Sequence, residues 1–247
     1  MIRSRRANPP RRRCSTTDQQ RFFVSSPPAT AVAGKIGRMV RLRVRIRFTK
    51  QGDLRLIGHR DLMRCFERLF RRAGLTLSFS QGFHPKPRMT FPLALAVGIE
   101  GMDEVMEVEL AAPTTAEQLL QRLTPHAPPG LVFRSVEVLP EGSKKASVCS
   151  TSYEATIPKA SQEGLRARIE HLLASPSCTV ARAAGRTAID IRPLLQELTL
   201  QEGVLQMRLR VDSRGSAGPR EVLGALGLAD IEAHGSQLLR TAVEVCA

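Results

Sequence analysis

The stretch R-L-R-V-R-I-R-F, residues Arg41–Phe48, alternates arginine with apolar residues along its whole length. Successive side chains of a β-strand point to opposite faces, so this alternation gathers the apolar residues on one face and the arginines on the other. The pattern predicts a half-buried strand. Such a strand belongs to a sheet with one buried face, which a second layer must cover.

The next segment is predicted to be a helix that supplies this layer. Its apolar residues recur at the three-four spacing of one helix face: Leu62, Cys65, Phe66, Leu69, Phe70 and Ala73. Gly58 is a weak N-cap, Asp61 suits the positive start of a helix, and Gly74 is a typical terminator. The spacing therefore predicts an amphipathic helix over residues 60–73.

Three more strands and one more helix complete a first unit. Strands are expected at 75–79, 105–110 and 131–138, and a helix follows Thr114, which forms a capping box with Glu117. The order β-α-β-β-α-β is that of the ferredoxin-like split βαβ fold, in which two helices cover one face of an antiparallel sheet. We predict an α+β fold with a ferredoxin-like domain over residues 39–140.

Beyond this domain the sequence predicts a linker and a second unit. Residues 141–150, E-G-S-K-K-A-S-V-C-S, are typical of a linker. Strand patterns follow at 153–157, 178–182, 188–191, 204–211 and 238–245, with helices after Ser161 and from Pro219. Residues 151–247 are therefore expected to form a second, smaller α+β unit of similar topology.

Composition excludes several classes of protein. Of 247 residues, 42% are hydrophobic and 24% are charged, which is close to the globular average and unlike a disordered, collagen-like or membrane-spanning chain. No run of eighteen apolar residues is present, so no membrane crossing is expected, and we expect no membrane among the partners. The five cysteines are scattered outside C-x-x-C spacing, which argues against a disulfide scaffold and a cysteine-ligated metal. We expect a cytoplasmic protein with no metal and no cofactor of its own.

The net charge of +14 is unevenly distributed. Residues 1–38 hold nine basic residues and one acid, and their prolines and serines predict a disordered basic tail or a segment upstream of a true start at Met39. Residues 39–95 hold thirteen basic and three acidic residues, and the rest of the chain is mildly acidic. An acidic partner such as RNA would therefore bind residues 39–95.

Two groups of basic residues are candidates for phosphate binding. Arginines spaced by three or four form a ridge on the predicted helix, and two cations follow in the next loop: Arg60, Arg64, Arg68, Arg71, Arg72, Lys86 and Arg88. The alternative is an ordinary solvated helix face. We expect the strand arginines to pair with Glu107 and Glu109 on the neighbouring strand instead, because that face lacks the aromatics of RNA-binding sheets.

The loop from Gly82 to Arg88, G-F-H-P-K-P-R, is the most distinctive short motif. Pro85 and Pro87 fix its backbone, which suits a preorganised binding site that also includes Phe83. His84 lies in this loop and His59 precedes the basic helix, so the pair are candidates for the general base and acid of metal-independent RNA cleavage. The alternative is that one is a helix-start polar residue and the other a loop hydrogen-bonder.

The motifs R-F-T-K-Q-G-D-L-R-L-I-G-H-R-D-L-M-R, F-S-Q-G-F-H-P-K-P-R-M-T-F and P-L-A-L-A-V-G-I-E resemble a bacterial radical-SAM-linked family of unknown function. That domain occurs alone or fused to the C-terminus of cobalamin-type radical SAM proteins. His59, Asp61 and Arg64 match the family's H-x-D-L-M-R. Where the family commonly reads G-F-N-P-H-P, this chain has His84 and Lys86, which weakens the two-histidine hypothesis.

The resemblance implies a partnership with a separately encoded radical SAM protein, because this chain lacks the C-x-x-x-C-x-x-C cluster motif. Three functions follow as hypotheses. The first is a non-catalytic accessory module that binds RNA or another phosphate-rich ligand. The second is an RNA-processing enzyme that uses His59 and His84, and the third is a protein-binding scaffold for the radical SAM partner.

Overall fold

A computed structural model describes residues 41–182, 187–212 and 215–246. The predicted tail over residues 1–38 lies outside these described residues. The described part is a mixed α/β fold with one large sheet and four α-helices. No helix in it is long and apolar enough to span a membrane.

The first strand and the first helix form as predicted. Strand β1 (Leu42–Lys50) buries Val44, Ile46 and Phe48 completely. Helix α1 (His59–Arg72) covers that face with its apolar stripe, and the rings of Phe48 and Phe66 meet edge to face at 4.9 Å. The helix ends where expected, because Gly74 takes φ +65° and the next amide donates to the carbonyl of Phe70.

Strands β3 (Glu100–Leu110) and β4 (Phe133–Val138) flank β1, both antiparallel to it. Helix α2 (Ala116–Leu123) adds its buried leucines to the core beneath α1. The predicted cap is wrong by one residue: Thr115 accepts from the amide of Gln118, and Gln118 bonds back to it. The sequence contains two overlapping capping boxes, Thr114 with Glu117 and Thr115 with Gln118, and the second is the one that forms.

The predicted strand at 75–79 does not form as a continuous strand. Leu77 makes a single bridge to Leu110, and the regular pairing with β3 is made by β2 (Met89–Thr90). The reason is local: the chain between these points folds back on itself, with Phe79 bridged to Pro87. Before that point the segment makes only isolated backbone hydrogen bonds at this edge: the Ser78 amide donates to the carbonyl of Glu109, and the Ala111 amide donates to the carbonyl of Thr76.

The second half contributes further strands and helices, and three of its details differ from expectation. No strand was predicted where β8 (Leu195–Gln201) forms. Strand β5 begins at Ser147, inside the predicted linker, and helix α3 starts after Gly164 rather than after Ser161. Helix α4 begins at Pro219, as predicted. The elements are β5 (Ser147–Thr156), α3 (Leu165–Ala174), β6 (Thr179–Val180), β7 (Ile189–Asp190), β8 (Leu195–Gln201), β9 (Val204–Asp212), β10 (Gly215–Ser216), α4 (Pro219–Ala225) and β11 (Leu238–Cys246).

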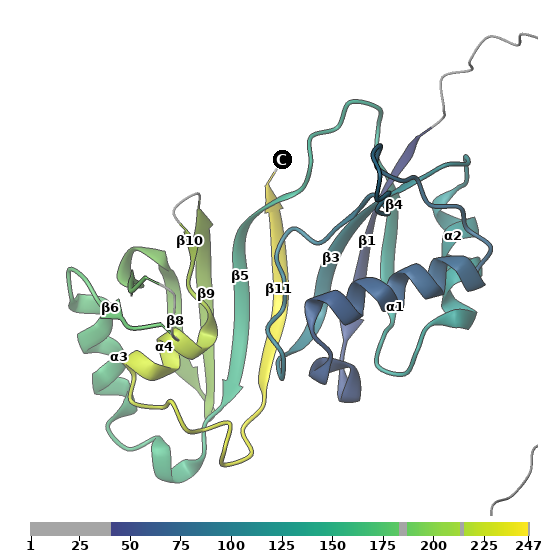
Figure 1. The fold of residues 1–247 in the computed structure, drawn as a ribbon. Coiled ribbons are helices and arrows are strands. Elements are labelled where there is room, and N and C mark those ends of the chain that lie inside the picture. Colours follow the sequence, from purple (N-terminus) through teal and green to yellow (C-terminus); the bar gives the residue numbers. More distant parts are fainter. Residues whose placement is uncertain (1–40, 183–186, 213–214, 247) are drawn as a thin grey trace, which may run out of the picture. The chain divides into compact units, whose positions relative to one another are not determined.

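Strand β11 joins the strands of both halves into one sheet. The order is β10-β9-β5-β11-β3-β1-β4, with β11 antiparallel to β5 and parallel to β3 (Figure 1). In the same view α1 lies in front of β1 and β3, and α4 lies in front of β9. The short 3₁₀ helices are Gly52–Leu56, Thr124–His126, Lys159–Ser161 and Arg192–Leu194.

Candidate functional site

The solvent face of α1 carries five exposed arginines, here called the α1 ridge: Arg60, Arg64, Arg68, Arg71 and Arg72. Arg64 lies 3.3 Å from Asp61, and both side chains are more than half exposed. Arg72 reaches the carbonyl of His126 at 3.4 Å. Among the described residues, Arg60, Arg68 and Arg71 have no ion-pair or side-chain hydrogen-bond partner. The ridge therefore presents cations that the fold leaves unneutralised.

The arginines of β1, in contrast, are paired, and the expected pairing with Glu107 is confirmed. Arg43 and Arg45 both bind this carboxylate, at 2.5 and 3.0 Å, and Arg47 binds Asp103. Burial opposes ionisation of Glu107, but the hydrogen bonds from Arg43, the Ala146 amide and Arg45 outweigh it and hold its pKa below the ordinary value. This face of the sheet is structural.

Glu109 is used differently from the expectation. It stands opposite Arg43 in the register of β1 and β3, but its recorded ion pair is with Arg88, at 3.6 Å. Arg88 also donates to the carbonyl of Phe79, so this side chain ties the motif loop to β3. Of the two predicted loop cations, only Lys86 is left exposed with a free ammonium among the described residues.

The motif loop from Gly82 to Arg88 is part of a narrow hairpin that begins at Ser78. This hairpin, residues 78–88, is here called the proline loop. The Ser80 amide donates to the Lys86 carbonyl at 2.8 Å, and the Lys86 amide donates back to the Ser80 hydroxyl at 3.0 Å. At its base the Arg88 amide donates to the Ser78 carbonyl. Gly82 takes φ +131° at the tip, a conformation that L side chains rarely adopt.

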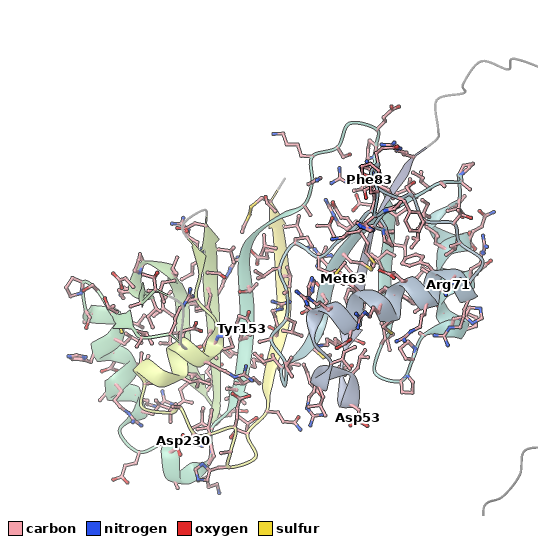
Figure 2. The ribbon with its side chains drawn as sticks, in the orientation of Figure 1. Asp53, Met63, Arg71, Phe83, Tyr153 and Asp230 are labelled. Atoms are coloured by element: carbon pink, nitrogen blue, oxygen red, sulfur yellow. A yellow bond between two sulfur atoms is a disulfide. The ribbon has the colours of Figure 1, made fainter. Side chains whose placement is uncertain are left out.

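Phe83 stands at the tip of this hairpin and is fully exposed (Figure 2). Phe79, further down the hairpin, is about half exposed. Phe83 lies in the loop to which the sequence assigned it, whereas Phe79 was assigned to the strand at 75–79, because phenylalanine in a strand-like run ordinarily indicates a core residue. The available signal was the combination of Gly82 with two prolines, which forces the chain out of the sheet.

The structure places the two candidate histidines in different settings. The ring of His59, at the first turn of α1, packs edge to face on Phe91 at 5.3 Å. His84 lies beside Phe83 on the exposed tip of the proline loop. Within the described residues no hydrogen bond, ion pair or ring contact joins them. Phe91 also packs against Phe66, so the end of the loop segment is fixed against α1.

A buried ionic cluster that sequence reasoning did not predict lies where β1, β3 and β11 meet. Arg240 and Lys50 are 1% exposed and Glu104 is 4% exposed. Arg240 pairs with Glu104 and donates to the carbonyls of Leu93 and Ala94. Lys50 donates to the carbonyl of Ile57, and burial lowers its pKa, opposed by the charge of Glu104.

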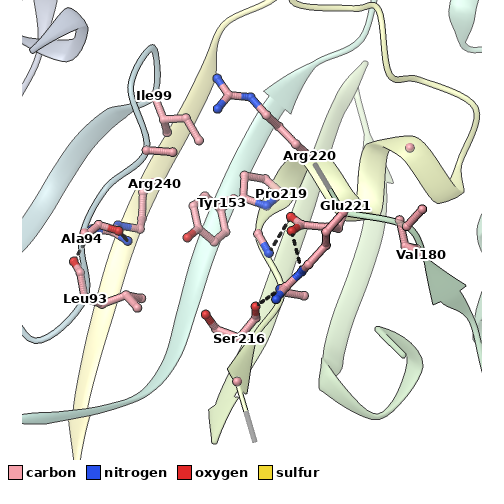
Figure 3. Close-up of a pocket in the computed structure, with 17 residues that line it drawn as sticks. Leu93, Ala94, Ile99, Tyr153, Val180, Ser216, Pro219, Arg220, Glu221 and Arg240 are labelled. Carbon is pink, nitrogen blue, oxygen red and sulfur yellow. Dashed lines mark hydrogen bonds and ion pairs between the residues drawn. The ribbon is translucent and has the colours of Figure 1, made fainter. Parts of the chain in front are cut away.

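A pocket of about 960 Å³ opens beside this cluster, between β5, β11 and α4 (Figure 3). Its lining includes four charged residues, and each of them already has a partner. Arg182 pairs with Glu221, Arg220 with Glu232, and Arg240 with Glu104. Every charged side chain in the described lining of the pocket is therefore already in an ion pair, and none is free to bind a charged ligand.

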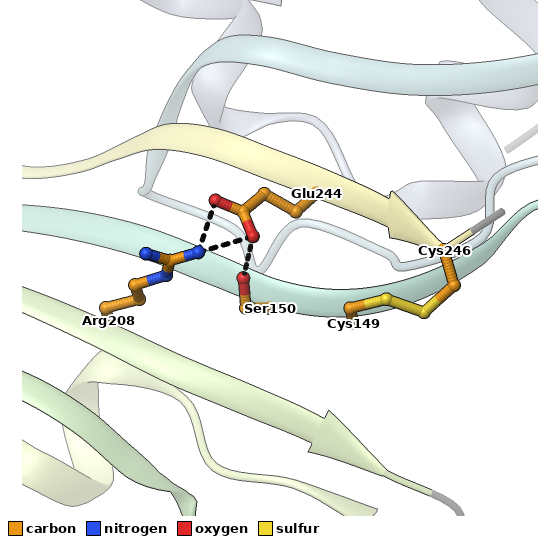
Figure 4. Close-up of a disulfide and its surroundings, with 5 residues drawn as sticks. All are labelled: Cys149, Ser150, Arg208, Glu244 and Cys246. Carbon is orange, nitrogen blue, oxygen red and sulfur yellow. Dashed lines mark hydrogen bonds and ion pairs between the residues drawn. A yellow bond between two sulfur atoms is a disulfide. The ribbon is translucent and has the colours of Figure 1, made fainter.

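The cysteine expectation needs a correction. Cys149 and Cys246 form a disulfide between β5 and β11, although they are 97 residues apart (Figure 4). No sequence motif marks such a cross-strand pair, because sheet register brings its members together. The described residues contain no group of His, Cys, Asp or Glu that could hold a metal ion.

The chain matches the model of a family described as "Uncharacterized protein conserved in bacteria (DUF2344)" over residues 43–219. No curated protein matches the chain. A crystal structure of an unknown protein from Galdieria sulphuraria is 15% identical, and the match covers 84% of this chain and 100% of that one, with a TM-score of 0.25. A putative glycine cleavage system transcriptional repressor is 11% identical, with 84% and 98% covered and a TM-score of 0.23.

Proposed function

The chain belongs to this bacterial family, and we propose that it is a non-catalytic accessory module that binds RNA or another phosphate-rich ligand. The α1 ridge would supply most of the phosphate contacts. The module would act in the cytoplasm beside a radical SAM enzyme encoded by a separate gene.

The observation that carries this proposal is the division of the arginines. Those on β1 are neutralised by Glu107 and Asp103, as structural arginines should be. Those on α1 face solvent, and Arg60, Arg68 and Arg71 have no acidic partner among the described residues. Unpaired like charges on one helix repel each other and weaken it slightly. A polyanion would relieve this repulsion.

The other proposed phosphate contacts are not equally free to bind a ligand. Arg64, Arg72 and Lys86 are exposed, and the partners recorded for the two arginines are an exposed carboxylate and a long contact to a carbonyl. Such exposed pairs cost little to exchange for a phosphate. Arg88 is half-buried against Glu109, so we assign it mainly to holding the proline loop in place.

The non-catalytic part of the proposal draws on the setting of the two histidines. General acid and base groups must both reach the reacting atoms. His59 is packed on Phe91, whereas His84 sits on the loop tip, and no orienting carboxylate bonds to either ring among the described residues. RNA cleavage by this pair is therefore the weaker hypothesis.

The radical SAM partnership is supported by the sequence motifs around His59 and the proline loop, which resemble the radical-SAM-linked family. The chain has no C-x-x-x-C-x-x-C motif, so the partner would hold the cluster. Co-purification of the two proteins after nuclease treatment would indicate direct docking, whereas loss of the complex with nuclease would indicate an RNA bridge.

A salt titration tests the electrostatic proposal. We expect affinity for a single-stranded RNA to fall steeply with salt, because each phosphate contact releases counterions. In the Arg68→Ala/Arg71→Ala double variant the slope of log affinity against log salt should shrink by about 1.4, since each contact to a single strand contributes about 0.7. Fluorescence anisotropy between 50 and 200 mM salt measures both slopes.

The matched control is the Arg166→Ala/Arg168→Ala double variant on the exposed face of α3, which removes the same charge from another helix. It should leave the slope unchanged. Equal slopes for wild type and both variants, or no binding by the wild-type protein, would contradict the proposal.

A further inference from the structure

We propose that Phe83 is a base-stacking residue, and that the ligand of this protein is therefore RNA with unpaired bases. This inference rests on the proposed function and names its substrate class. The observation behind it is a fully exposed phenylalanine on a fixed hairpin, in a strongly basic segment.

The exposure of Phe83 is unusual for its residue type. Its relative exposure is 102%, and the next most exposed large hydrophobic residue, Val132, is at 58%. A phenylalanine loses the benefit of burial when it stands in water. The described core does not use this ring, so a role outside the fold accounts for it better than packing does.

The hairpin holds this ring in a defined position before any ligand arrives. Reciprocal hydrogen bonds join Ser80 and Lys86, and a bridge joins Phe79 and Pro87. Pro85 and Pro87 restrict the returning arm. Because the backbone is already ordered, little conformational entropy is lost when the ring binds.

The surplus of basic residues around the proline loop favours a polyanion as the partner. Residues 68–99 contain no aspartate or glutamate, yet they contain Arg68, Arg71, Arg72, Lys86 and Arg88. Two carboxylates lie near the base of the loop among the described residues, and both have partners: Glu109 pairs with Arg88, and Glu107 pairs with Arg43 and Arg45. Lys86 lies on the same hairpin as Phe83, and no partner of its ammonium is recorded among the described residues. An exposed ring and a cation on one loop can bind single-stranded nucleic acid, in which the ring stacks on a base and the cation contacts a phosphate.

The arrangement also distinguishes single strands from duplexes. In a duplex the base faces are covered by their stacked neighbours, so a protruding ring cannot reach them. Unpaired bases in loops, bulges and ends can be splayed out onto aromatic side chains. Phe83 should therefore add affinity for unpaired RNA and nothing for duplex RNA of equal charge.

The test compares three proteins on two ligands at one low salt concentration. The proteins are wild type, the Phe83→Ala variant and the Val132→Ala variant, which trims an exposed apolar residue directly before β4. The ligands are a labelled twelve-nucleotide single strand and a duplex of the same length. We expect Phe83→Ala to weaken single-strand binding about tenfold to hundredfold, with duplex binding unchanged and Val132→Ala without effect.

A Phe83→Trp variant provides a direct reading of the contact, because the chain contains no tryptophan. Stacking should quench its fluorescence when the single strand is added, and the duplex should not. Anionic vesicles of phosphatidylglycerol and phosphatidylcholine are a second ligand for this variant. A blue shift with vesicles and no quenching with RNA would overturn the inference in favour of membrane insertion.

The two proposals fail in different ways. If wild type binds RNA with the expected salt slope but Phe83→Ala binds the single strand equally well, the stacking role is overturned and the electrostatic proposal stands. If wild type binds neither RNA, both are overturned.

Discussion

Glu107 neutralises two arginines of β1 with a single carboxylate. Its oxygens bind Arg43 and Arg45, its side chain is 5% exposed, and the Ala146 amide also donates to it. We expect Glu107→Gln to lower the free energy of unfolding by about 2 kcal/mol, because charge-assisted hydrogen bonds to a nearly buried group are lost. Urea unfolding at pH 7 measures this, with Asp61→Asn as the exposed control at less than about 1 kcal/mol.

The same residue predicts a pH dependence. The hydrogen bonds hold the pKa of Glu107 below its ordinary value of 4.5 in the folded protein, despite burial. A lowered carboxyl pKa stabilises the folded state fully above the ordinary value, and this contribution is lost as the pH falls through the folded pKa. The gap between wild type and Glu107→Gln should therefore shrink below about pH 4.5. A gap that stays constant to pH 3 would contradict the pairing.

Residue patterns predicted the inner face of β1 and the stripe of α1 because both depend only on neighbours in the chain. The same patterns misplaced Phe79, whose apolar character says nothing about whether its segment reaches the core, whereas Phe83 was correctly assigned to the loop. They also predicted Thr114 as the cap of α2 where Thr115 caps it, since both residues fit the same spacing rule. The sequence identified the candidate cations, but it predicted only some of their ion pairs.

At the scale of elements, β11 is tied to β5 by the disulfide between Cys149 and Cys246. A bond closing a loop of 97 residues restricts the unfolded chain, and bonds of this kind typically contribute about 2–4 kcal/mol. We expect Cys246→Ser to lower the free energy of unfolding by this amount without reductant. With dithiothreitol the variant and wild type should converge, as urea unfolding would show.

The control is Cys178→Ser, which removes a free cysteine and should leave the response to reductant unchanged. Disulfides are rare in cytosolic proteins, so the result also bears on the proposed cytoplasmic location. If dithiothreitol leaves wild-type stability unchanged, the bond contributes nothing under these conditions.

Strand β8 illustrates why some elements escape sequence reasoning. Its register against β9 shifts between Leu195 and Glu197, so its buried leucines do not alternate regularly. A bulge of this kind breaks the period of two on which strand prediction depends. Strands β9 and β11 lie close to their predicted positions because their apolar residues keep that period over most of their length.

At the scale of the whole molecule, the sheet is continuous through β11, and no local pattern indicates this. Gly101 of β3 lies between Lys50 of β1 and Arg240 of β11 in the sheet register. A side chain at Gly101 would come within 2.6 Å of Glu104, so glycine leaves the room in which this carboxylate meets Arg240. Arg240 and Glu104 are 136 residues apart, and only the assembled sheet makes them neighbours.

We predict that this buried pair couples the two halves of the sheet. Arg240→Met should lower the free energy of unfolding by about 3–5 kcal/mol, because Glu104 keeps a buried charge without its hydrogen-bonded partner. In wild type, the fluorescence of Tyr153 in β5, the chain's single tyrosine, and amide exchange in α1 should report one shared urea transition. In the variant the two transitions should separate, with α1 and β5 unfolding at different urea concentrations. The Arg240→Met/Glu104→Gln double variant should recover part of the stability, because the unpaired carboxylate is removed, but not all of it, because Lys50 then loses the charge of Glu104 that opposes its desolvation. If the two urea transitions coincide in Arg240→Met, the backbone pairing with β11 is enough to make the two halves unfold together.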